Sequence, residues 1–186
     1  MVGSYTDAGG FHGFVGSAGS FISIDVPVPN AAATSAFGIN SSGRVVGPYT
    51  VAGVAHGFLW IPGGQFAAFS LFDDPVSGGD TIPVGINDAG QIVGDYDDAT
   101  GRHGFLDDGG VFTTIDVPFA DAGTTSLSGI NNHGQIVGSY RDFDGFHGFV
   151  ATPIPLSAVP LPRTGLLLGA GLTCLAVGRR RQIMKI

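Results

Sequence analysis

The hydrophobic positions of the chain fall in short runs that are separated by turns rich in Gly, Asp and Asn. Residues 81–117 show this best, with the runs TIPVGI, QIVGDY, HGFL and VFTTIDV. Short runs rich in β-branched and aromatic residues, bounded by Gly and Asp, predict strands. The turn Asn87-Asp88-Ala89-Gly90 suits a type I turn closed by a glycine in the left-handed conformation. The segment is therefore expected to form four short strands joined by tight hairpins.

The same pattern recurs along the chain. It reads GINSSGRVVGPYTVAGVAHGF at 38–58, GINDAGQIVGDYDDATGRHGF at 85–105 and GINNHGQIVGSYRDFDGFHGF at 129–149, while VGSYTDAGGFHGF at 2–14 matches its second half. The period is 47 and then 44 residues, which indicates a repeat architecture. The recurring polar positions are Asn40, Asn87 and Asn131 in the Gly-Ile-Asn turns and His12, His56, His103 and His147, each nine residues after the Gly of Val-Gly.

Four antiparallel strands in 44 to 47 residues match one blade of a β-propeller. Residues 1–150 are thus predicted to be all-β, as a propeller-like array of about three and a half four-stranded antiparallel units. A closed propeller typically has four or more blades. Either sequence before Met1 completes a ring or the array stays open, and because Met1 falls inside a repeat, we expect the chain to be a fragment or to have a misplaced start.

These units resemble the extracellular HAF repeat family, in which a His-Ala-Phe tripeptide follows a Gly-Ile-Asn-Asn-x-Gly-x-Val-Val-Gly core. The resemblance covers roughly residues 2–150. The chain differs in having His-Gly-Phe in all four copies. The resemblance implies a repeat domain that works outside the cell.

Composition agrees with a strand-rich body and divides the chain by charge. The chain has 32 Gly, no Glu and one Lys, so good helix formers are scarce. Up to Pro162 it carries fifteen Asp against three Arg, a net charge of −12, whereas from Arg163 onward four Arg and Lys185 give +5. The body lacks the basic stripe that phosphate binding needs, so no nucleic-acid partner is expected.

The repeated histidines invite a metal site, but a structural role is favoured. Equivalent positions of different blades lie too far apart to share one ion. Each His is followed by Gly-Phe, so we expect the Phe in the core and the His in a turn or inter-blade hydrogen bond. No metal and no cofactor is predicted.

The acidic turns suggest Ca²⁺, because Asp95, Asp97 and Asp98 precede Gly101, and Asp142 and Asp144 precede Gly145, at ligand-like spacing. Neither run completes a calcium-loop pattern, and solvated turn residues are the favoured interpretation.

No enzyme activity is expected. The chain has no G-x-S-x-G, and without Glu it has no H-E-x-x-H. The pairs Asp73-Asp74 and Asp107-Asp108 lie in Gly/Pro turns, where both carboxylates should be solvated and ionised, leaving no acid with a raised pKa.

The end of the chain differs from the body. Residues 151–163 contain four prolines and are predicted to be an extended linker. Residues 164–178 are apolar all round and would rise about 22 Å as a helix, short of the roughly 30 Å hydrocarbon core. We predict a marginal transmembrane helix, followed by a basic tail, residues 179–186, that stays in the cytoplasm while the acidic body lies outside.

Three features in order at this end are similar to the PEP-CTERM sorting signal, also known as the ice-binding protein C-terminal domain. They are the motif Val159-Pro160-Leu161-Pro162, the short apolar helix, and the cluster Arg179, Arg180 and Arg181. Leu161 replaces the usual Glu of that motif. The resemblance implies that the chain pauses in the inner membrane of a Gram-negative bacterium, is cut by an exosortase, and is released or transferred to the cell surface.

The favoured function is therefore an exported surface protein whose repeats act as a structural or binding module, with a glycan or a protein as possible ligand. One alternative is a surface protein that stays anchored because its helix is never cut. Another is a fragment of a secreted propeller hydrolase.

Overall fold

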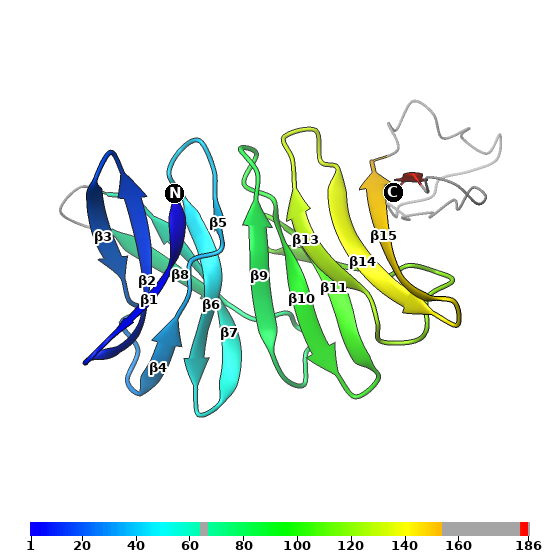
Figure 1. Cartoon of the computed structure of the whole chain (residues 1–186), viewed down its shortest axis with the longest axis horizontal. Coiled ribbons are helices and arrows are strands. Elements are labelled where there is room, and N and C mark those ends of the chain that lie inside the picture. Colours follow the sequence, from blue (N-terminus) through cyan, green and yellow to red (C-terminus); the bar gives the residue numbers. More distant parts are fainter. Residues whose placement is uncertain (64–66, 154–182, 186) are drawn as a thin grey trace, which may run out of the picture.

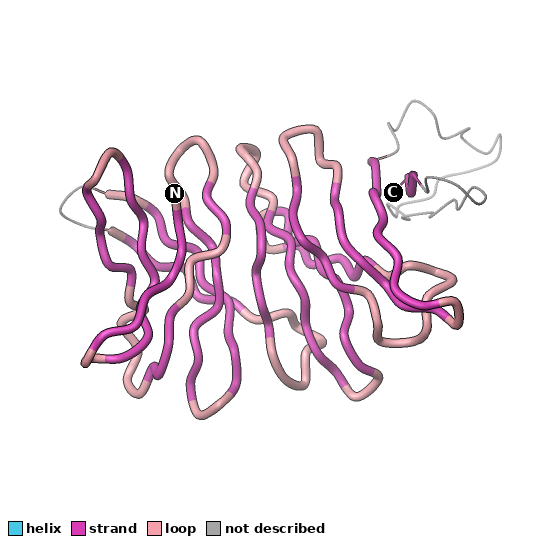
Figure 2. Tube along the Cα trace, in the orientation of Figure 1, coloured by secondary structure: helices cyan, strands magenta, loops and turns pink. Residues whose placement is uncertain are grey.

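The computed structural model describes residues 1–63, 67–153 and 183–185, and within them the protein is all-β (Figure 1). Figure 2 shows strands joined by loops throughout these residues. We group the strands into four units that follow the sequence repeats. Unit 1 comprises β1 (Val2–Asp7), β2 (Gly10–Ser17) and β3 (Ser20–Ile24); unit 2 comprises β4 (Ala31–Thr34), β5 (Gly38–Ile39), β6 (Val45–Val51), β7 (Val54–Ile61) and β8 (Ala68–Phe72); unit 3 comprises β9 (Thr81–Ile86), β10 (Ile92–Asp98), β11 (Gly101–Asp108) and β12 (Val111–Ile115); unit 4 comprises β13 (Ser126–Ile130), β14 (Ile136–Asp142) and β15 (Gly145–Thr152).

Unit 3 confirms the predicted four-stranded hairpin pattern. Its strands form an antiparallel sheet in the order β12-β11-β10-β9. In the turn between β9 and β10, Gly90 has a φ of 89° and its backbone N donates to the carbonyl of Asn87 at 3.1 Å. A register shift lies at Val93/Gly94, where a Cβ on Gly94 would collide with the carbonyl of Ile82. This close approach of β9 explains the glycine of the repeated Val-Gly pair.

The other units vary this sheet. Units 1 and 2 share one eight-stranded sheet, in which Phe11 of β2 pairs with Ala33 of β4. In unit 4, β13, β14 and β15 repeat the first three strands of unit 3. The outer edge of β15 pairs in parallel with β16 (Ile183–Lys185).

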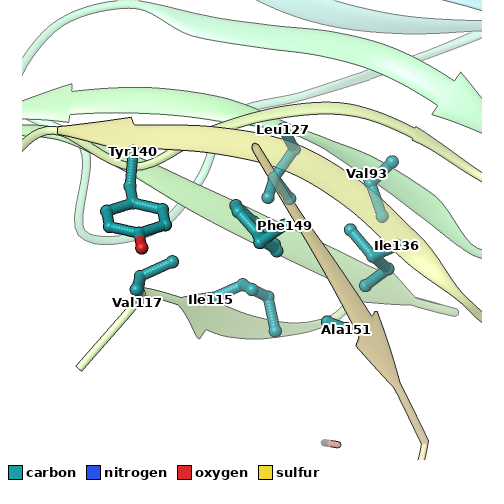
Figure 3. Close-up of a cluster of buried hydrophobic side chains, with 8 residues drawn as sticks. All are labelled: Val93, Ile115, Val117, Leu127, Ile136, Tyr140, Phe149 and Ala151. Atoms are coloured by element: carbon teal, nitrogen blue, oxygen red, sulfur yellow. The ribbon is translucent and has the colours of Figure 1, made fainter. Parts of the chain in front are cut away.

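The core lies between neighbouring units as well as within them. The units stand side by side in chain order, from β1 to β15 (Figure 1). One buried cluster joins Val46 of unit 2 to Tyr96 and Phe105 of unit 3. The next joins Val93 of unit 3 to side chains of unit 4 that include Tyr140 and Phe149 (Figure 3). Units 2 and 3 therefore each complete their hydrophobic core with the unit that follows.

The described units form an open row, because units 1 and 4 lie at its opposite ends (Figure 1). The closed ring considered from the sequence is not formed by them.

The predictions for the end of the chain fall largely outside the described residues. These are the motif at 159–162, the helix at 164–178 and the cluster at 179–181. Within the described residues, no helix has the length and apolar character needed to cross a membrane. The predicted linker at 151–163 starts two residues too early, since Ala151 and Thr152 belong to β15. Ile183–Lys185, part of the predicted cytoplasmic tail, is a strand beside the repeats.

Candidate functional site

The Asn of each Gly-Ile-Asn motif closes its own turn. In all three complete repeats its Oδ1 accepts a hydrogen bond at 3.0 Å from the backbone N four residues later. These pairs are Asn40 with Arg44, Asn87 with Gln91, and Asn131 with Gln135. A side-chain amide that accepts at this position fixes the turn.

The same side chains bind the next unit. Nδ2 of Asn40 donates to the carbonyl of Asn87 at 3.1 Å, and Nδ2 of Asn87 donates to the carbonyl of Asn131 at 3.2 Å. These bonds span 47 and 44 residues, which are the two repeat periods. We call this series the asparagine ladder (Asn40, Asn87 and Asn131). It ties the turns of units 2, 3 and 4 together along one end of their strands.

A second series runs beside the ladder and is centred on Asp88. Its carboxylate accepts from the backbone N of Ser41 at 2.8 Å and from Nδ2 of Asn132 at 2.7 Å, while its own backbone N donates to Oδ1 of Asn132 at 2.9 Å. The hydrogen bond from the Ser41 backbone, followed by those from the Ser41 and Asn132 side chains, lowers the pKa of Asp88. Asp88 is thus an ionised bridge among three units, a role that the sequence did not indicate.

Each repeated His lies opposite a Tyr on the neighbouring strand and against its ring. The ring centroids are 5.1 to 5.3 Å apart in all four units. The Phe two residues after the His is buried in units 2, 3 and 4, as predicted from the His-Gly-Phe pattern. The four pairs are Tyr5 with His12, Tyr49 with His56, Tyr96 with His103, and Tyr140 with His147.

Carboxylates of the same unit hold these histidines. In units 1, 2 and 3, Nδ1 lies 2.8, 3.0 and 2.8 Å from Asp25, Asp73 and Asp116, which follow the last strand of each unit. In unit 4, Nε2 of His147 lies 2.9 Å from Asp142. These hydrogen bonds stay within a unit. They hold the end of the last strand or the hairpin turn in place. They do not join neighbouring units, as the inter-blade bonds considered from the sequence would.

The carboxylates shift the titration of two histidines. For His12, the hydrogen bond to Asp25 raises the pKa, against a smaller opposing effect of burial. For His103, burial alone would lower the pKa, but the hydrogen bond to Asp116 and the charges of Asp116 and Asp98 together raise it. Both imidazoles therefore favour the protonated form more than a free histidine does.

Unit 3 contains a group that resembles a catalytic triad in outline. Asp116 contacts Nδ1 of His103, and Nε2 of His103 lies 2.8 Å from Oγ1 of Thr100. The hydroxyl of Thr100 donates its single proton to Asp98 at 2.7 Å. His103 must then act as donor towards Thr100, in keeping with its raised pKa, and a donor cannot serve as the general base that activates a nucleophile.

Three acidic residues that were predicted to be solvated are buried, namely Asp74, Asp95 and Asp107. Asp95 is 5% exposed and accepts from the backbone N of Leu127 at 2.7 Å and from Oγ of Ser126 at 2.6 Å, which links unit 3 to unit 4. Burial raises its pKa. Asp74 is 4% exposed, and burial raises its pKa as well. The expectation that no acid would have a raised pKa was therefore wrong, because units 3 and 4 pack over Asp95 and a tight loop encloses Asp74.

The other candidate calcium ligands serve the hairpin. Asp97 accepts two hydrogen bonds from Arg102, both at 3.0 Å, and Asp98 accepts from the backbone N of Thr100 at 2.6 Å. In the part of the chain that the structure describes, no three His, Cys or acidic side chains converge as metal ligands would.

The two ends of the row each carry a concavity. At the unit 1 end, a cavity of about 520 Å³ is lined by Tyr5, Phe14, Phe21 and Ser23. At the unit 4 end, a groove of about 350 Å³ is lined by Arg102, Thr124, Ser126, Ser139, Arg141 and Phe146. The first is aromatic, whereas the second combines two guanidinium groups, hydroxyls and one ring.

Comparison with known proteins adds no relative: no family model, no curated protein and no solved structure matches the chain.

Proposed function

We propose that the protein is an exported bacterial surface protein with a C-terminal exosortase-type sorting signal. The observation that carries the proposal is the order of three features at 159–181: a Val-Pro-Leu-Pro motif, a marginal apolar helix and an arginine cluster. An acidic body before the helix and cations after it favour an orientation with the body outside the cytoplasm. The chain would pause in the inner membrane and then reach the cell surface or the medium.

This route requires that the pairing of Ile183–Lys185 with β15 be broken during insertion. If residues 164–178 span the membrane, Ile183–Lys185 and β15 are on opposite sides of it. Their parallel pairing must then be absent while the chain is inserted.

We further propose that the units are propeller-type blades that serve as a non-enzymatic structural or binding module. The four-stranded meander of unit 3 and the cores shared between consecutive units support the first part. The contacts between the repeated histidines and carboxylates support the non-enzymatic role, because these histidines hold strands of their own unit in place. A glycan or a protein is the class of ligand we propose, and the body's negative charge disfavours nucleic acid.

The sorting proposal is tested by following the C-terminus of the protein. The full chain, with a secretion signal added before Met1, is produced in a Gram-negative host that has an exosortase and in the same host without it. Cells are fractionated, and the C-terminus of the surface and released material is determined by mass spectrometry. We expect material that ends before residue 164 only in the host with the enzyme.

Variants separate the motif from the linker around it. Pro160→Ala combined with Pro162→Ala should retain the protein in the inner membrane, whereas the control Pro155→Ala in the same segment should be processed normally. Intact Ile186 in surface material would overturn the sorting proposal. Its persistence in the inner membrane of both hosts would favour a permanent anchor.

A further inference from the structure

Every internal interface of the row joins the same two faces. The forward face of a unit, which meets the next unit, carries the Val of the Val-Gly pair. The backward face carries the Tyr and Phe that neighbour the repeated His. Val46 and Val93 are both 0% exposed, in clusters with the Tyr and Phe of the following unit. Val2 packs in the same way against the cluster that contains Tyr49 and Phe58.

No described residue covers the forward face of unit 4. Val137, the counterpart of Val46 and Val93, is 42% exposed, and Phe146 beside the groove is 83% exposed. The glycines of the Gly-Ile-Asn motifs indicate independently whether a unit follows, because they stack from unit to unit. A Cβ on Gly38 would lie 3.0 Å from Cα of Gly85, and one on Gly85 would lie 3.2 Å from Cα of Gly129.

A Cβ on Gly129 would meet no atom of the described residues within 4 Å. The stack of glycines therefore ends at Gly129. The position next to it is open, whereas next to Gly38 and Gly85 the same position is filled by the following unit.

Among the described residues, none covers the backward face of unit 1 either. Tyr5 is 39% exposed, whereas its counterparts in the other three units are at most 8% exposed. Phe21 is 61% exposed and lines the cavity of about 520 Å³ together with Tyr5 and Phe14. In unit 3 the corresponding aromatic cluster is filled by Val46 and Phe72 of unit 2.

We propose that two copies of this chain associate head to tail, with the forward face of unit 4 in one copy on the backward face of unit 1 in the other. The contact continues an interface that the row already contains three times. Units 1 and 4 lie at opposite ends of the row, so these two units of one copy cannot cover each other (Figure 1). A contact between two different faces leaves one of each uncovered in the dimer, so further copies can add.

Charge favours the same pairing. Arg102 of unit 3 and Arg141 of unit 4, two of the body's three arginines, line the groove at the unit 4 end of the row. Each pairs with an aspartate of its own chain and has further N–H donors. Residues 1–30 contain Asp7 and Asp25 and no Lys or Arg. The groove therefore offers guanidinium groups to a unit that has carboxylates and lacks Lys and Arg.

The contact should be weaker than the internal ones. Unit 1 has no described counterpart of β9 or β13, the strands that pack on the preceding unit inside the row. Covalent trapping is therefore the appropriate measurement, since it detects a contact that dissociates on dilution.

The test uses the full chain in detergent micelles. Cys174, the sole cysteine, is replaced by Ser, and Val137→Cys or Tyr5→Cys is introduced before treatment with a short bismaleimide. We expect cross-linked dimers when the two single variants are mixed, and a series of larger products when both cysteines are in one chain. The proposal is overturned if the mixture gives no dimer, or if either variant alone cross-links as efficiently as the mixture.

A steric variant checks that the forward face is responsible. Gly129→Val should abolish the cross-link in the mixture and leave the unfolding midpoint of the single chain unchanged, because its side chain enters open space. Gly78→Val is the matched control, since a Cβ there also meets nothing within 4 Å, and it should cross-link normally. If residues 154–182 of the same chain cover the face instead, Val137→Cys will resist a monofunctional maleimide and form no dimer, which overturns the proposal.

Discussion

The asparagine ladder makes a quantitative prediction at Asn87. Replacing Asn87 with Ala removes a side chain that is 2% exposed and bonded in two directions. Its Nδ2 donates to Oε1 of Gln91 at 2.8 Å and to the carbonyl of Asn131 at 3.2 Å, and its Oδ1 accepts from the backbone N of Gln91 at 3.0 Å. Asn87→Ala should therefore weaken both its own turn and the contact between units 3 and 4.

The magnitude follows from these three bonds. A hydrogen bond contributes about 1 kcal/mol net, and a buried group left without a partner costs roughly 1–3 kcal/mol. We expect Asn87→Ala to lower the free energy of unfolding by about 3 kcal/mol. Asn131→Ala is the matched control: Asn131 makes the same bonds within its turn but is exposed, so water can replace them. We expect it to cost about 1 kcal/mol.

Urea unfolding measures the difference. Trp60, the only tryptophan, is buried in unit 2, so its fluorescence follows that unit while circular dichroism follows the whole row. Asn87→Ala should shift both signals to lower urea. If Asn87→Ala and Asn131→Ala lower the free energy of unfolding by the same amount within about 0.5 kcal/mol, which is roughly how closely the effects of separate sites add, the bond between units contributes nothing and the reasoning fails.

Three further predictions concern titration and packing. Because the pKa of His103 is raised in the folded protein, its protonation stabilises the fold fully at pH values below the ordinary pKa of 6.5, and progressively less as pH rises through the folded pKa. The stability difference between the native chain and Asp116→Asn, measured by urea unfolding, should therefore shrink from pH 6 to pH 9. A constant difference would refute this link. Burial raises the pKa of Asp95, so its ionisation opposes folding above the ordinary value of 3.8; Asp95→Asn should be more stable than the native chain at pH 7, with the gap closing towards pH 4, and lower stability at pH 7 would contradict this sign. Phe105 is fully buried, so Phe105→Ala should cost about 3–5 kcal/mol, and a loss below about 1 kcal/mol in thermal unfolding would show that the shared core is not packed as described.

The local structure could be predicted from the sequence because it depends on neighbouring residues. The strands and turns of unit 3, including the left-handed glycine at Gly90, follow from short-range pattern and turn chemistry. The repeat period also placed Asn40, Asn87 and Asn131 at equivalent positions, which is a necessary condition for a ladder.

The contacts between units could not be predicted in the same way. Whether an Asn amide reaches the next turn depends on how closely two units stack, and no local pattern encodes that distance. Asp95 is the clearest case, since its counterparts are Pro48 and Ser139 in the complete repeats and no recurring signal marked it. Its burial depends on the position of β13 beside it.

The unequal repeat periods show where this scaffold tolerates insertion. From the ladder Asn to the His the chain takes sixteen residues in each complete repeat, as from Asn40 to His56 and from Asn87 to His103. The hairpin formed by the last two strands differs instead: residues 62–67 separate β7 from β8 in unit 2, and only 109–110 separate β11 from β12 in unit 3. Foreign loops grafted at that hairpin should be displayed at regular intervals along the row while the stacking register is kept, which makes the array a natural frame for presenting variable surface loops.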